Sequence, residues 1–97
     1  MTNTTTPTNI DPDFTPESHD VGSTSAQSSA IITGSGKIRI CTTTHCHIKF
    51  GANPTATEED VMLPPNHVEV FTFKSGDKVA FIHHGGGSGE INISAID

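Results

Sequence analysis

Apolar and polar residues alternate with a period of two along several stretches of the last two thirds of the chain. The clearest are residues 37–41, 46–50, 67–73, 78–83 and 90–94, and shorter apolar runs occupy residues 30–33 and 61–63. Such alternation, enriched in Val, Ile and Phe, is typical of β-strands with one buried face. Clusters rich in Gly, Pro, Asn and Ser separate the stretches and favour turns. Short strands at this spacing predict an all-β fold, a small antiparallel β-sandwich of the jelly-roll kind, with one short helical turn at residues 57–60.

Residues 1–29 have a different composition. They are rich in Thr, Ser and Pro and contain neither Lys nor Arg. Their sizeable apolar side chains after Met1 are Ile10, Phe14 and Val21. Such a segment buries too little apolar surface to offset its ordering entropy. We therefore expect an extended or disordered, non-regular N-terminal arm over residues 1–29 and a β-sandwich domain over residues 30–97. On a partner, Ile10, Phe14 and Val21 would be the arm's anchors.

Length and charge exclude several classes of function. The chain has 97 residues and a formal net charge of −6, which suits one small domain and argues against a nucleic-acid partner. No apolar run approaches the roughly 18 residues of a transmembrane helix, so we expect no membrane partner. The N-terminus lacks the basic and apolar regions of a secretory signal, which predicts synthesis in a cytoplasm.

The two cysteines lie close together in the sequence, at Cys41 and Cys46. A hairpin that pairs Ile40 with Ile48 would bury the apolar residues of both strands. In that register Cys41 lies on the outer face, opposite His47, while Cys46 points inward. The pattern predicts two reduced cysteines rather than a disulfide.

The histidines raise the question of a metal site. His45 and His47 share one strand face, and His83 and His84 end another strand. Structural zinc sites usually show two tight pairs of ligands, which this chain lacks. We expect these histidines to be exposed and predict no metal ligands, no cofactor and no catalytic residues. Two alternatives remain: that the histidines line an interface in an oligomer, and that the protein is a small cupin-like metal enzyme.

Residues 36–94 resemble a small structural protein of tailed bacteriophage virions. The resemblance lies in strand and turn positions: residues 38–41, 46–51, 53–57 and 62–66, Glu69, Phe71, and residues 76–82. It implies a non-enzymatic capsid decoration or cement protein, located in the virion, that binds the major capsid protein or another virion protein. A domain of about 60 residues buries only about 60% of its unfolded surface, so further contacts in a homo-oligomer on the particle would add stability. A tail-adaptor or fibre-attachment protein is the alternative within the same class.

Overall fold

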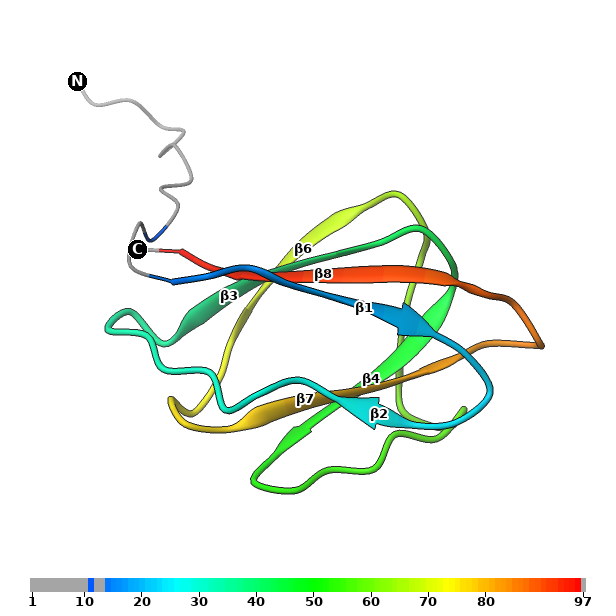
Figure 1. The fold of residues 1–97 in the computed structure, drawn as a ribbon, viewed down its shortest axis with the longest axis horizontal. Helices are drawn as coiled ribbons and strands as arrows, with labels where there is room; N and C mark the ends of the chain where they lie inside the picture. Colours follow the sequence, from blue (N-terminus) through cyan, green and yellow to red (C-terminus); the bar gives the residue numbers. More distant parts are fainter. Residues whose placement is uncertain (1–10, 12–13, 97) are drawn as a thin grey trace.

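The computed structural model describes Asp11 and residues 14–96, which form eight β-strands (Figure 1). In chain order these are β1 (Glu17–Val21), β2 (Ala26–Gln27), β3 (Lys37–Thr42), β4 (Cys46–Gly51), β5 (Val61–Leu63), β6 (Val68–Thr72), β7 (Lys78–His83) and β8 (Gly89–Ala95). Among the described residues, no helix is long and apolar enough to cross a membrane.

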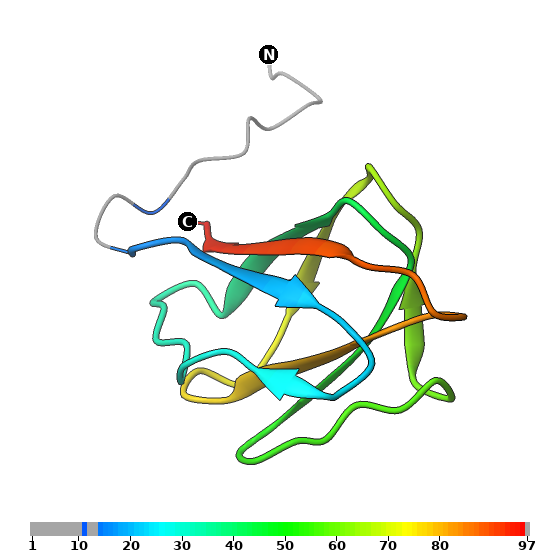
Figure 2. The same cartoon turned by 45° about the vertical axis from the view of Figure 1, so that its right-hand side comes forward.

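The strands form two antiparallel sheets packed as a sandwich (Figures 1 and 2). One sheet has the order β1-β8-β3-β6 and the other the order β2-β7-β4-β5. β1 pairs with β8, β2 with β7, β3 with β6 and β4 with β5, as in one long hairpin. That hairpin is rolled up, so that β8 also pairs with β3 and β7 with β4. This is the topology of a jelly roll, and the predicted fold class is confirmed.

The core lies between the sheets and consists mainly of β-branched side chains. Ile38 and Ile40 of β3 and Ile91 and Ile93 of β8 are at most 1% exposed. From the other sheet, Ile48, Val79 and Phe81 meet them. Burying each large apolar side chain contributes about 1.5–3 kcal/mol. The alternation that predicted the strands is therefore also the pattern that fills the core.

The sandwich begins at Glu17 rather than at residue 30, so the predicted arm boundary is wrong. β1 pairs with β8 from Glu17 opposite Ile93 to Val21 opposite Gly89, and β2 adds two residues to the other sheet. Three side chains of β1 point toward the core side, and two of them, Glu17 and His19, are polar. They bond to each other at 2.8 Å, and the His19 ring packs on Phe81 with ring centroids 5.3 Å apart. The sequence pattern does not reveal this strand, because two of its inward side chains are polar and form a hydrogen bond with each other.

The predicted hairpin of β3 and β4 is also wrong. Ile40 lies opposite Ile93 and Glu69, while Ile48 lies opposite Phe81 and Val61. The apolar residues of β3 and β4 belong to opposite sheets and face each other across the core. The apolar residues of both strands are buried although β3 and β4 do not pair. Alternation of apolar and polar residues is the same in a β3–β4 hairpin and in two facing sheets, so it could not distinguish the two.

Two further predictions fall on loops. Residues 57–60 form a hydrogen-bonded turn rather than helix, closed by the Asp60 N–H on the Thr57 carbonyl at 3.0 Å. Residues 30–33 are not a strand, yet Ile31 is fully buried, and its backbone bonds to Asp77 and Gly76. An apolar residue can thus enter the core from a loop.

Candidate functional site

The edges formed by β5 and β6 carry most of the exposed apolar side chains. β5 ends one sheet and β6 ends the other, so each has a partner strand on one side only. Of the large apolar residues exposed in the described part of the chain, all but Ile32 lie on these strands: Val61 (61%), Met62 (50%), Val68 (48%) and Val70 (48%). We call this edge of the sandwich, formed by the two strands, the β5–β6 face. Val61 lies at its opening between the sheets, whereas Met62, Val68 and Val70 point to the outer sides of their sheets.

A cavity of about 360 Å³ opens at the β5–β6 face. Its lining is mainly apolar and comes from both sheets: Ile48, Lys49, Phe50, Asp60, Val61 and Phe71. The Phe50 and Phe71 rings meet across the sandwich with centroids 5.6 Å apart. The cavity exists because β5 and β6 do not pair and leave the sandwich open between them. Unpaired edges with apolar side chains are surfaces on which another chain can pack.

The residues predicted to anchor an arm on a partner do not form this site. Val21 is 2% exposed and belongs to the core of its own chain, so its predicted role as a partner anchor is wrong. Phe14 is half-buried and packs against the same core. Ile10 lies outside the described residues. Of these side chains, Val21 and Phe14 pack within the sandwich of their own chain.

The cysteines occupy the environments that strand parity predicted for them, although in a different sheet arrangement. Cys46 is fully buried and Cys41 is half-buried, and both thiols are free. Burial raises the pKa of the Cys46 thiol. Cys46 thus behaves as a small apolar core residue.

The histidines are not all exposed, and on this point the sequence prediction is wrong. His47 is 4% exposed, and the ring of His84 lies beside it, with centroids 5.1 Å apart. The ring of His45 lies near that of His84, with centroids 6.0 Å apart. His45 lies opposite His84 because the β4–β7 register places Cys46 opposite His83, and the next pair along the two chains is His45 and His84.

Glu58 joins these histidines, and the sequence analysis missed it. Its Oε1 accepts the Gly85 N–H at 3.0 Å and lies 3.8 Å from His84 Nδ1. The Gly85 N–H bond and the nearby histidines hold the pKa of the Glu58 carboxyl below its usual value. The loop that carries Glu58 is distant in sequence from His84, so no local motif links them. The acidic residues after Thr57 suit the first turn of a helix, and this pattern gives no sign of a contact with histidines.

Comparisons with protein-family models, curated proteins and solved structures find no match to this chain.

Proposed function

We propose that this protein is a non-enzymatic structural protein of a bacteriophage particle. It decorates or cements the capsid by binding neighbouring subunits. The β5–β6 face is the observation that carries the proposal, because it combines two unpartnered sheet edges with exposed apolar side chains and an apolar cavity. The sequence predicts that the N-terminal segment docks on the partner. In this proposal the β5–β6 face, at the opposite edge of the sandwich, docks instead.

The chemistry of the face fits a protein partner. Val68 and Val70 supply apolar area on β6, and the cavity between Phe50 and Phe71 can receive an apolar side chain. Lys49 and Asp60 at the rim of the cavity can make polar contacts. Interfaces of this kind bury about 800 Å² per partner, with an apolar centre and a polar rim.

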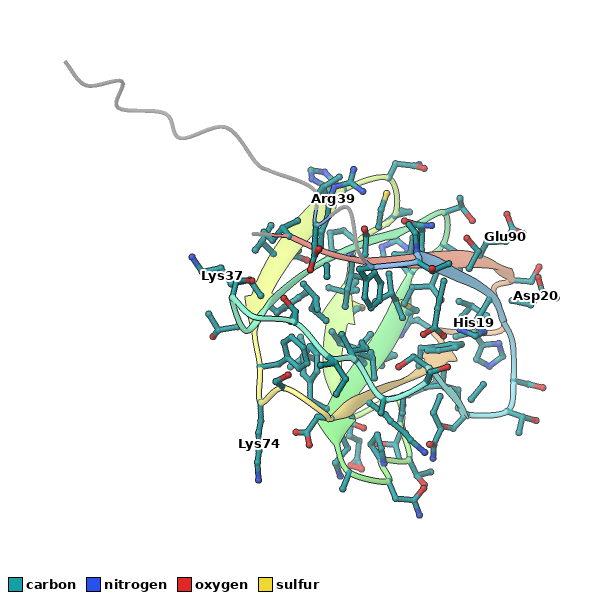
Figure 3. The ribbon with its side chains drawn as sticks, turned by 60° about the vertical axis from the view of Figure 1, so that its left-hand side comes forward. His19, Asp20, Lys37, Arg39, Lys74 and Glu90 are labelled. Carbon is teal, nitrogen blue, oxygen red and sulfur yellow. The ribbon has the colours of Figure 1, made fainter. Side chains whose placement is uncertain are left out.

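The charges outside the face support contacts with further copies of the chain. Figure 3 shows Asp20 and Glu90 at one end of the molecule and Lys37 and Lys74 at the other. Asp20 and Glu90 lie directly opposite each other in the β1–β8 pair, where like charges destabilise an isolated sheet. A basic end of a neighbouring copy would relieve this repulsion, in keeping with a homo-oligomer on the particle.

The test is co-sedimentation with phage particles that lack this protein. We expect the purified wild-type chain to bind, and Val70→Glu to weaken binding at least tenfold, because a carboxylate would be desolvated in the apolar interface. Thr24→Glu is the matched control, since Thr24 is exposed on the loop between β1 and β2. Absence of wild-type binding, or full binding by a folded Val70→Glu variant, would contradict the proposal.

A further inference from the structure

His47, His84 and Glu58 meet on the outer face of the sheet β2-β7-β4-β5. His47 lies on β4 opposite Ile82 of β7, and its neighbours Cys46 and Ile48 point into the core. His84 follows Ile82 by two residues, which returns it to the outer face beside His47. Glu58 comes from the loop between β4 and β5. One nitrogen of each ring and a Glu58 carboxylate oxygen all lie within 4.8 Å of one another.

The hydrogen bonds of His47 fix its tautomer. Its Nδ1 lies 2.8 Å from the Asp60 carbonyl oxygen, which can only accept, so Nδ1 carries the proton. Its Nε2 therefore presents a lone pair toward His84 Nδ1, 2.9 Å away. A histidine that binds a metal nearly always donates its other ring N–H to a carbonyl or carboxylate in this way. The His47 ring is also buried, so its orientation is fixed before any ion arrives.

Two of the three distances among these atoms are close to those of a tetrahedral zinc site, and the third is at most 4.8 Å. With bonds of about 2.0–2.2 Å, tetrahedral ligand atoms lie about 3.4 Å apart. The His47–His84 nitrogen pair, at 2.9 Å, would widen by about half an ångström, and Glu58 Oε1, at 3.8 Å from His84 Nδ1, would approach by a similar amount. Both His84 and Glu58 are about half exposed, so their side chains have room for this adjustment.

We propose that His47 Nε2, His84 Nδ1 and a Glu58 carboxylate oxygen bind one Zn²⁺ ion. Two imidazoles and a carboxylate suit zinc among the divalent ions, and the half-exposed side leaves its fourth position open to water. On binding, the hydrogen bond that His84 Nδ1 donates to His47 Nε2 is replaced by two metal–nitrogen bonds, and the proton leaves His84 Nδ1 while Nε2 takes one from water, so that the ring stays neutral. The ion ties the β4–β5 loop to the ends of β4 and β7. This site adjoins the β5–β6 face, because His47 lies opposite Met62 and contacts the Asp60 carbonyl, but zinc binding does not depend on the proposed capsid role.

The site is tested by titrating untagged, chelator-treated protein with Zn²⁺ in competition with a chromophoric chelator. We expect one ion per chain and a higher thermal midpoint in the zinc-saturated protein, because an ion that binds the folded state more tightly than the unfolded chain stabilises the fold. Glu58→Gln and His84→Gln should each weaken binding at least tenfold. Both positions are half exposed, so these variants should fold, whereas changing the buried His47 would not separate binding from folding.

Two matched variants and a thiol variant complete the experiment. Glu59→Gln removes the neighbouring carboxylate, His67→Gln removes an exposed histidine after β5, and Cys41→Ser removes the accessible thiol. All three should bind zinc as the wild type does. Absence of saturable one-to-one binding at free zinc concentrations up to about 100 µM would overturn the proposal. So would wild-type affinity in Glu58→Gln and His84→Gln, or an equal loss in any of the three controls.

Discussion

Neighbouring side chains on β4 show how closely chemistry depends on which face a residue occupies. Cys46 and His47 are both buried, but Cys46 points into the core and His47 points to the outer face of the same sheet. Cys46 is surrounded by apolar side chains and stays protonated, whereas His47 is buried among hydrogen-bond partners. Burial of a polar side chain is tolerated when its atoms are satisfied, and among the described residues no buried side-chain polar atom lacks a partner.

The difference between the two thiols can be measured by alkylation with iodoacetamide at pH 8. We expect Cys41 to react first, because it is half-buried, while Cys46 is fully buried. Burial both blocks access to Cys46 and raises its pKa, which lowers its thiolate fraction, so its labelling should be at least 100-fold slower and should require unfolding. Cys41→Ser should therefore abolish fast labelling, and Cys46→Ser should preserve it. Two thiols that react equally fast in the folded protein would disprove this assignment.

At the scale of elements, β1 is a strand that the sequence pattern did not predict but that completes one sheet of the sandwich. It covers the edge of β8, and Val21 seals the core beside Ile91 and Ile93. β2 and the residues after it continue this cover on the second sheet, where Ser28 Oγ accepts the buried Val79 N–H at 3.0 Å. Removing this segment would expose both edges at once.

Limited proteolysis with thermolysin tests the role of this segment. We expect every stable fragment to retain residues 17–27, because β1 and β2 are paired in the two sheets. A chain that begins at Ala30 should lose cooperative unfolding, since it lacks Val21 and both edge strands. A chain that begins at residue 14 is the control and should keep the wild-type circular dichroism spectrum. A stable fragment that starts between residues 28 and 31 would contradict this expectation.

At the scale of the molecule, the topology joins segments far apart in the chain. β1 pairs with β8 near the other end of the sequence, and β2 pairs with β7. Closing such long loops costs conformational entropy before the contacts form. Asp11 also bonds to Ala95 at 3.1 Å, which brings the beginning and the end of the described chain together (Figure 2).

This topology predicts slow folding, on the scale of milliseconds to seconds. Refolding is best followed by far-ultraviolet circular dichroism, since the chain has neither Trp nor Tyr. A circular permutant opened in the loop at Gly86 places β8 before β1, with residues 96–97 and 1–16 between them, and so shortens the loop that their pairing closes. We expect it to refold faster than the wild type at similar stability. An equal rate in both chains would show that β1–β8 pairing does not limit folding.

The sequence by itself determined the strands from β3 onward and the class of fold. Alternation of apolar and polar residues is a local property, so β3, β4, β5, β6, β7 and β8 lie where the pattern predicted them, within one residue at most ends. The same parity placed Cys46 in the core. Strands with one apolar face form sheets with one apolar face, and two such sheets bury these faces by packing against each other as a sandwich.

Only the tertiary structure decided which strands pair and which polar residues come together. β1 carries polar residues on its inner side, and its stability comes from β8 and Phe81, which lie far away in the sequence. The choice between a β3–β4 hairpin and two facing sheets depends on the packing of all strands at once. Glu58 reaches His47 and His84 only because the β4–β5 loop folds back over the sheet. Contacts between distant residues leave no periodic signal in the chain, because their hydrogen bonds and packing form only when the fold brings the two residues together.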